Sequence, residues 1–378
     1  MKPRALAAVV ALLAPLVLVS CRGDVDVSAG SDGDPAPTTS TLPPPPAADP
    51  RTDIYAATAA GMFSPTVAGV PTRVYVPNSE SNTVDVIDPT TFKVIDHFDV
   101  GHQPQHVTPA WDLRTLYVDN DLGDTLTPLD PHTGQRVGPD LPVEDPYNLY
   151  FTLDGSRAIV VAERFRRLDF RDPHTWQVVG SVPIPHRGVD HMDFSVNGKY
   201  VIASCEYSGW LVKVDVEKMQ MVGELEVKGQ PIDVKLSPDG KIFYVANQSR
   251  DGVSLVDGDN LKELEFVHTG KGAHGLYVSR DGRFLYVTNR GEGTVSVIDF
   301  ATKKVVANWM SGGSPDMGGV SADGKQLWLS GRYNREVYVL DTSDGSLLAT
   351  IPVGTGPHGL SIFPQPGRYS LGHTGIFR

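Results

Sequence analysis

The chain of 378 residues carries 33 lysines and arginines against 45 aspartates and glutamates, a formal net charge of -12. This acidic balance argues against sequence-independent binding to nucleic acid or to anionic lipid, because both need a positively charged surface. With 38 glycines, 30 prolines, 40% hydrophobic and 21% charged residues, the composition predicts a folded, turn-rich protein rather than a helical membrane bundle or a disordered chain.

The first 21 residues have the pattern of a signal peptide. Two basic residues open the chain, and the apolar run over residues 5–19 is too short to count safely as a membrane span. The run ends in Leu18-Val19-Ser20-Cys21, which resembles a bacterial lipobox, the motif of a cysteine that becomes lipidated. The alternative is an ordinary secretory signal with an unrelated cysteine. We expect a lipoprotein held to the cell membrane through Cys21, outside the cytoplasm, at the cell surface or in the periplasm.

Residues 22–71 form the next segment. Up to residue 52 they are mostly Ser, Thr, Asp, Ala and Pro, a composition that cannot bury enough apolar surface to fold. Residues 53–71 are more apolar, with Tyr55 and Phe63 among them, so we expect this part to pack onto the folded domain. The prediction for 22–71 is therefore a stalk followed by a docking segment.

A repeat of 42 or 43 residues runs through most of the remaining chain. Its first marker is an aspartate after an apolar pair or alternation, at Asp88, Asp130, Asp172, Asp215, Asp257, Asp299 and Asp341. A second marker is a turn pair at the same step: Asp154-Gly155, Asn197-Gly198, Asp239-Gly240, Asp281-Gly282 and Asp323-Gly324. Two markers in register indicate seven copies of one structural unit.

Each unit contains short alternating or apolar runs separated by turns, the pattern of β-strands. In the sixth unit we assign strands to residues 284–288, 294–298 and 305–309, and a fourth to residues 318–321. Four strands in about 40 residues are typical of a propeller blade, so the prediction is an all-β, seven-bladed β-propeller over residues 72–364. We label the strands of a blade A to D from the axis outward.

The strand count also predicts how the ring closes. The first unit begins at residues 73–76 with a B-type strand, and the last A-type segment, residues 358–363, has no strands after it. The C-terminal A strand should therefore complete the first blade, which removes the open edges. Residues 365–378 remain as a C-terminal tail.

The repeat text resembles a known family. Residues 286–289 read Tyr-Val-Thr-Asn, and residues 244–247 and 75–78 are near copies. Together with the Gly-x-x-Pro-His-Gly and Ser-x-Asp-Gly elements, they make residues 72–364 similar to the YVTN-repeat β-propellers. The resemblance implies the fold, but this family spans surface-layer proteins, haem-linked nitrite reductase domains and many lipoproteins, so it implies little about activity.

In a propeller the A-strand starts and the B-strand ends lie on one face, here termed the channel mouth, and the Asp-Gly turns lie on the other, the turn face. His132 and His174 lie in turn-face loops and His97 in an outer strand, so we interpret these three as structural. The D–A junctions bring a set of polar residues to the mouth: His106, Asn148, Asp190, His191, His274, Asp316 and His358. At the B-strand ends four units have asparagine and the seventh has Gly331, whereas the third and fourth have Glu163 and Cys205.

Neutral imidazoles that converge on one cavity suit a transition metal or haem iron, with carboxylates as ligands or as hydrogen-bond partners. His106 and His191 are the candidate metal ligands. They lie one register step from His274 and His358, so the four need not meet at one point. For His274 and His358 we favour a simple role in holding the loop by hydrogen bonds.

The third unit departs most from its neighbours, which marks it as a place for specific work. Arg164 and Arg166 could clamp a carboxylate or phosphate at the mouth, or Arg164 could form ion pairs with Glu163 and Asp169. The strand-end position of Cys205 is more typical of a half-buried, inert thiol than of a nucleophile or ligand.

The usual catalytic and cofactor-attachment motifs are missing, which argues against an enzyme without excluding one. We expect a membrane-anchored propeller that binds a small ligand, a metal or a partner protein at the mouth. The alternative is a propeller enzyme, or a redox accessory protein with haem or a metal, that uses the same residues. A purely structural envelope role is the third hypothesis.

Overall fold

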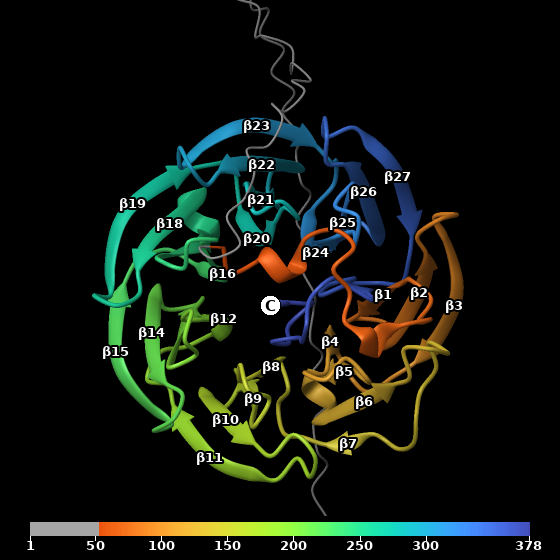
Figure 1. Ribbon diagram of the computed structural model, residues 1–378, viewed down its shortest axis with the longest axis horizontal. Coiled ribbons are helices and arrows are strands. Elements are labelled where there is room, and N and C mark those ends of the chain that lie inside the picture. Colours follow the sequence, from red (N-terminus) through yellow and green to blue (C-terminus); the bar gives the residue numbers. More distant parts are fainter. Residues whose placement is uncertain (1–52) are drawn as a thin grey trace, which may run out of the picture. The chain divides into compact units, whose positions relative to one another are not determined.

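The computed structural model describes residues 53–378, which form seven four-stranded antiparallel sheets around a central channel (Figure 1). The inner strand of each sheet lies beside the channel and the outer strand lies at the rim. Four short 3-10 helices connect or flank the strands: η1 (Ala56–Thr58), η2 (Pro65–Val67), η3 (Asp121–Gly123) and η4 (Gln248–Arg250). The predicted seven-bladed propeller is confirmed.

The strands follow one order in every blade, from the channel outward. Blade one contains β28 (Ser361–Phe363), β1 (Arg73–Asn78), β2 (Thr83–Asp88) and β3 (Lys93–Asp99), and blade two contains β4 (Pro104–Pro109), β5 (Leu116–Asn120), β6 (Thr125–Leu129) and β7 (Leu141–Pro142). Blade three contains β8 (Asn148–Phe151), β9 (Ala158–Ala162), β10 (Arg167–Arg171) and β11 (Val178–Pro183). Blade four contains β12 (Val189–Phe194), β13 (Tyr200–Cys205), β14 (Trp210–Asp215) and β15 (Gln220–Glu226). Blades five to seven contain β16 (Pro231–Leu236), β17 (Ile242–Asn247), β18 (Gly252–Asp257) and β19 (Lys262–His268); β20 (Ala273–Val278), β21 (Phe284–Asn289), β22 (Thr294–Asp299) and β23 (Lys304–Met310); β24 (Pro315–Val320), β25 (Gln326–Gly331), β26 (Glu336–Asp341) and β27 (Leu347–Pro352).

The ring closes as predicted, because β28 near the end of the chain pairs with β1 near its start. The register places Ile362 opposite Val74 and Ser361 opposite Tyr75. One strand assignment was wrong: residues 318–320 belong to β24 of the seventh blade, and the fourth strand of the sixth blade is β20. The reason is chain order, since in blades two to seven the A strand precedes its B strand along the chain.

Burial follows the distance of a strand from the channel. All five residues of β9 are buried, whereas exposed and partly buried residues alternate along the outer strand β15. A strand in the middle of a blade, such as β9, is covered by neighbouring blades on both faces, so its sequence is a continuous apolar run, and an outer strand keeps one face in water. The hydrophobic core therefore lies between successive blades rather than at one central point.

The two repeat markers are turn residues with a local physical role. The carboxylate of Asp257 accepts from the backbone N–H groups of Asp259 and Asn260 at 2.9 and 3.0 Å. In the Asp-Gly turns, Gly282 has φ +66°, a conformation that residues with a Cβ rarely adopt. These requirements recur from blade to blade, which explains why the markers keep their spacing.

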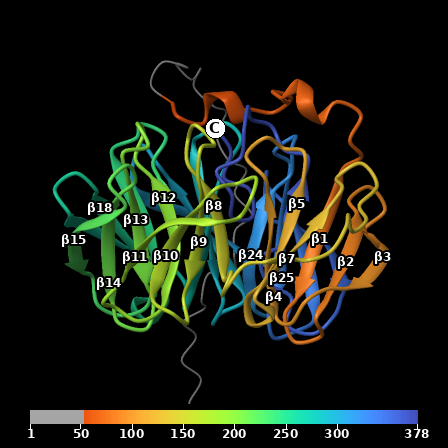
Figure 2. The ribbon, with the colours of Figure 1, turned by 90° about the horizontal axis from the view of Figure 1, so that it is seen from below.

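The N-terminal docking segment and the C-terminal tail cover the turn face of the ring (Figure 2). The Tyr55 hydroxyl donates to the Leu236 carbonyl at 2.8 Å, and Phe63 forms a parallel β-bridge with Gly367. The Arg378 side chain lies 3.0 Å from Asp193 at the end of an inner strand. Both ends of the described chain are thereby bound to one side of the propeller.

The tail also enters the channel. Gly372 forms an antiparallel bridge with Tyr150 of β8, and the His373 N–H donates to the Leu149 carbonyl at 2.7 Å. The channel is therefore closed from the turn face by the chain's own C-terminal residues.

Several predictions from the sequence lie outside the described residues: the signal peptide 1–21 with Cys21, and the stalk over 22–52. Within residues 53–378, no helix has the length and apolar character needed to cross a bilayer.

Candidate metal centre

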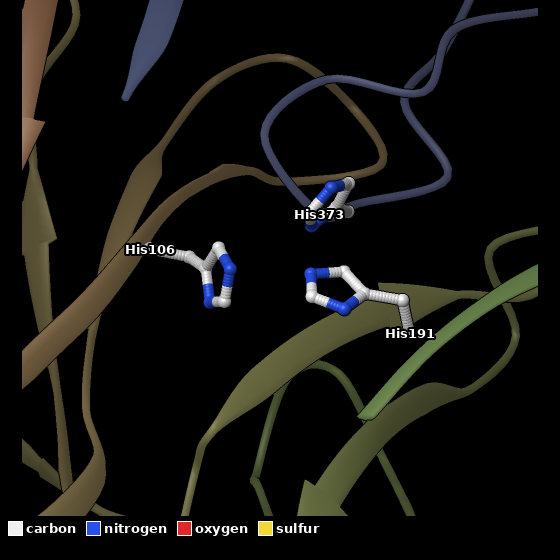
Figure 3. A group of neighbouring side chains, drawn as sticks. All are labelled: His106, His191 and His373. Carbon is white, nitrogen blue, oxygen red and sulfur yellow. The ribbon is translucent and has the colours of Figure 1, made fainter. Parts of the chain in front are cut away.

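Three histidines from distant parts of the chain meet in the channel (Figure 3). His106 is the third residue of β4, His191 is the third residue of β12, and His373 lies in the C-terminal tail. One ring nitrogen of each lies within 4.8 Å of the others, and all three side chains are buried. We call His106, His191 and His373 the three-histidine centre.

The Nδ1 atom of each ring faces a partner that orients it. For His106 this partner is the Tyr147 carbonyl at 2.8 Å, and for His191 it is the Asp190 carboxylate at 2.6 Å. For His373 it is the side-chain amide of Asn148, whose nitrogen and oxygen lie 3.1 and 3.4 Å away. The His373 ring presents an Nε2 lone pair in the tautomer whose Nδ1 donates to the amide oxygen. A carbonyl only accepts, so the proton of a neutral His106 ring lies on Nδ1 and its Nε2 presents a lone pair.

The Nε2 atoms have no such partners. All three are buried and lack a hydrogen bond within the part of the chain that the structure describes. Buried polar atoms are nearly always satisfied, because leaving one unpaired costs about 1–3 kcal/mol. The His191 Nδ1 lies close to Asp190 but also has no hydrogen bond of good geometry. Three neighbouring imidazoles with unpartnered Nε2 atoms are a set of donors that suits a transition metal.

The protonation states fit this geometry for two of the three rings. Burial, with the neighbouring imidazoles, holds the pKa of His106 and of His373 well below the usual range, so both rings are neutral. Burial also acts to lower the pKa of His191, but the negative charge of Asp190 outweighs it and raises that pKa. His191 therefore carries the centre's basic site, and a cation bound there competes with a proton.

A second group of buried polar residues lies beside the three-histidine centre. Asp316 accepts from Arg290 at 2.9 Å, and its carboxylate lies 2.7 Å from Nδ1 of His358 and 3.1 Å from Nδ1 of His274. We call these four residues the Asp316 cluster. The ring of His358 lies 5.0 Å from that of His106, so the cluster and the centre share one channel.

Burial governs the titration of the Asp316 cluster too. Burial and then the charge of Arg332 lower the pKa of His358 to about 4, against the opposing effect of Asp316. Burial and then the charge of Arg290 hold the pKa of His274 well below its usual range. Burial alone would raise the pKa of Asp316, but His274, Arg290 and His358 hold it well below the usual range. The cluster is an ionised carboxylate between one arginine and two neutral histidines.

Two further carboxyl groups lie at the mouth near Asp190. Burial, with the charge of Asp190, raises the pKa of Glu163 and that of Glu206 to about 7. Cys205 is fully buried, and burial raises the pKa of its thiol to about 12. At that pKa the thiol is neither a nucleophile nor a ready metal ligand near neutral pH.

The structure separates Arg164 from the channel residues. Its guanidinium lies 2.6 Å from Asp124 and 3.4 Å from Asp145. The ion pair with Asp169 belongs instead to Arg167, at 2.9 Å. Arg164 therefore forms ion pairs, as one of the two interpretations expected, but with Asp124 and Asp145 instead of Glu163 and Asp169.

The remaining candidates from the sequence converge on the channel in spite of their different registers. Tertiary packing brings His106 within ring distance of both His191 and His358, at 5.5 and 5.0 Å. Sequence reasoning missed His373, Arg290, Arg332 and Glu206. His373 follows no repeat, so no spacing marked it, and the two arginines lie in B–C connections where only blade three had drawn attention.

The fold and the site together define a seven-bladed β-propeller with a histidine-lined, internally closed channel. The YNCE-like beta-propeller family model matches residues 47–367, and the chain belongs to this family. No curated protein matches the chain.

Three solved structures illustrate the likeness in fold. A functionally unknown protein from Desulfotomaculum acetoxidans has a TM-score of 0.67 at 18% identity, over 77% of this chain and 98% of its own. Kuenenia stuttgartiensis hydrazine synthase has a TM-score of 0.60 at 20% identity, over 68% and 88%. A dihydro-heme d1 dehydrogenase has a TM-score of 0.60 at 16% identity, over 83% and 82%. At these identities the likeness shows the fold alone.

Proposed function

We propose that this protein is a metal-binding propeller that holds a divalent transition-metal ion on His106, His191 and His373. The observation that carries the proposal is the set of three buried, unpartnered Nε2 atoms, each on a ring whose Nδ1 faces an orienting group. Imidazole ligands suit zinc, copper, iron, cobalt and nickel, whereas calcium and magnesium prefer oxygen.

Three protein ligands leave further coordination positions open. An ion bound in this way can polarise a carbonyl or phosphoryl oxygen, or lower the pKa of a bound water. The residues of the chain supply the rest: Tyr147, Asp190 and Asn148 fix the ring orientations, and the C-terminal tail closes the channel behind the centre. The centre is thus suited to binding, or to chemistry on, a molecule that enters from the mouth.

A bare ion fits the donor set better than haem does. A porphyrin fills four positions around its iron and leaves two axial ones on opposite faces of the ring. Three imidazole nitrogens that all lie within 4.8 Å of one another cannot all be axial ligands of one haem. Although the dihydro-heme d1 dehydrogenase shares the fold, a haem site is therefore not the version of the function that we propose.

The metal proposal is tested on protein purified without chelators. We expect elemental analysis to find about one transition-metal ion per chain, and metal-free protein to bind added Zn²⁺ or Co²⁺ with a rise in melting temperature, because an ion that binds only the folded state stabilises it. His191→Ala should abolish the uptake, while His132→Ala, at an exposed turn-face histidine, should not. Equal metal uptake by both variants, or none by the wild type, would overturn the proposal.

We also propose that the propeller is a lipoprotein outside the cytoplasm, anchored through Cys21. The support is the lipobox-like Leu18-Val19-Ser20-Cys21 after a charged start and an apolar run. Cys21→Ser should move the protein from the membrane fraction to the soluble fraction and prevent labelling with radioactive palmitate. Unchanged membrane association of the variant would contradict the anchor.

A further inference from the structure

Arg332 is a half-buried arginine in the connection between β25 and β26, at the channel mouth. Its backbone N–H donates to the Ser314 carbonyl at 3.2 Å. The Nη1 atom of its guanidinium is buried and has no hydrogen-bond partner among residues 53–378. A guanidinium stays protonated at any ordinary pH, so this donor carries positive charge that the protein has not paired.

The guanidinium acts on the same space as the three-histidine centre. Burial is the largest cause that lowers the pKa of His358, and the charge of Arg332 is the next. Arg332 follows Arg290 by 42 residues, and His358 follows Asp316, the residue that Arg290 contacts, by the same 42. The repeat therefore places Arg332 beside His358, whose ring lies 5.0 Å from that of His106.

Arg290 provides an internal comparison, since it lies in the equivalent connection of the preceding blade, between β21 and β22. Its two terminal nitrogens donate to Asp316 and to Gln248. The positive charge of Arg290 is thus paired with a carboxylate of the protein. Arg332 lies in the same connection one blade further along the ring. Its Nη1 atom has no partner among the described residues, whereas Nη1 of Arg290 donates to the carboxylate of Asp316.

Charge within the channel leads to the same point. A divalent ion on three neutral imidazoles brings a charge of +2, Asp190 offsets one unit of it, and Arg332 adds one, which leaves +2. The two other carboxyl groups nearby, Glu163 and Glu206, have pKa values of about 7 because burial raises them, so they offset this charge only in part at neutral pH. Water can accept from Nη1 but cannot neutralise the excess charge.

We infer that the channel mouth binds a small carboxylate- or phosphate-bearing anion, with one oxygen on an open position of the metal and another accepting a hydrogen bond from Nη1 of Arg332. The metal contact rests on the proposed function, whereas the contact with Arg332 does not. Arginine is the residue best suited to such oxygens, because its planar fork matches their spacing and its hydrogen bonds to them are charge-assisted.

The test uses the full chain loaded with Co²⁺, whose visible absorption responds to a new ligand, and titrates it with acetate and with inorganic phosphate. We expect at least one of them to shift the spectrum saturably, and Arg332→Gln to weaken that anion about tenfold or more. Arg332→Lys keeps the charge but loses the planar fork, so its affinity for the anion should lie between those of the wild type and Arg332→Gln. Arg335→Gln, an exposed arginine in the same connection, should bind as the wild type does.

Metal content separates the two proposals. Arg332→Gln should hold Co²⁺ at least as tightly as the wild type, because a nearby positive charge has been removed. If it does, and yet binds the anion equally well, or if neither anion shifts the wild-type spectrum, the inference is wrong and the metal site stands. If the wild type takes up no metal, the proposed function fails. Calorimetric titration of the metal-free protein with the same anions then decides the inference, which survives only if Arg332→Gln weakens binding.

Discussion

The channel contains two histidine groups that differ in what their ring nitrogens meet. In the Asp316 cluster, the Nδ1 atoms of two histidines face one carboxylate, which Arg290 also holds. In the three-histidine centre, each Nδ1 faces a separate residue, one nitrogen of each ring lies within 4.8 Å of the others, and all three Nε2 atoms are buried without a partner. Burial is as complete in both groups, so neither burial nor the number of histidines marks a metal site. The unpartnered Nε2 atoms are what distinguishes the three-histidine centre.

The largest effect that we expect is a loss of stability in acid, which protonates buried histidines of both groups, and His358 gives its size. The folded pKa of His358 is about 4, below the unfolded value of about 6.5, so the unfolded chain binds more protons between these pH values. Stability should therefore fall by about 3 kcal/mol from this residue alone as the pH drops from 6.5 to 4. Denaturant unfolding at pH 7 and pH 4 should show a smaller drop for His358→Gln, which cannot be protonated. The same drop in both proteins would contradict a neutral His358.

Removing one ring from each group tests the comparison most directly. His106→Ala should weaken Zn²⁺ binding about a hundredfold, if one ligand contributes about a quarter of the 10–16 kcal/mol of a four-ligand site. His274→Ala should leave the affinity close to that of the wild type, because its Nδ1 faces Asp316 instead. Competition with a chromophoric chelator measures both affinities, and circular dichroism checks the fold. Equal losses would mean that the two groups act as a single site.

The carboxylates give a smaller and more specific contrast. Asp190→Asn should reduce metal affinity about tenfold or more, since partners that orient a ligating histidine commonly contribute 10–100-fold. Asp316→Asn should instead reduce stability, because it leaves the largely buried Arg290 without its charge partner. The same chelator competition, with denaturant unfolding, distinguishes the outcomes. A loss of metal affinity in Asp316→Asn as large as in Asp190→Asn would erase the distinction.

The smallest effect concerns the rim of the mouth. The Arg164 side chain is 39% exposed. Its pair with the exposed Asp124 contributes about 0–1 kcal/mol, and it also lies 3.4 Å from the buried Asp145. Arg164→Gln should therefore lower the unfolding free energy by about 1 kcal/mol and leave metal uptake unchanged. A marked loss of metal or anion binding would return Arg164 to the site.

Most of the fold could be predicted because its signals are local and repeated. An aspartate that caps a turn, as Asp257 does, meets the same need in each blade, so its spacing reports the repeat directly. The closure by β28 followed from counting strands. The assignment of residues 318–320 to the sixth blade was wrong, because the sequence of a strand does not show which neighbouring strand it pairs with.

The candidate site was predictable only in part. His106 and His191 stood out because they departed from the repeat, and the structure places both at the three-histidine centre. His373 gave no comparable signal, since the tail has no sibling in the chain for comparison. Arg164 looked equally distinctive, yet nearby acidic residues hold it at the rim.

By itself, the sequence determined seven copies of a four-strand unit and a ring latched by its last strand, because turn chemistry and strand periodicity act over a few residues. Only the tertiary structure decided that the tail turns back into the channel and brings His373 to His106 and His191. Only the tertiary structure also showed that Asp316 and Arg290 pair within their cluster, while Nη1 of Arg332 has no partner among the described residues. The reason is physical: these outcomes depend on which side chains from distant blades reach the same few cubic ångströms, and no local pattern carries that information.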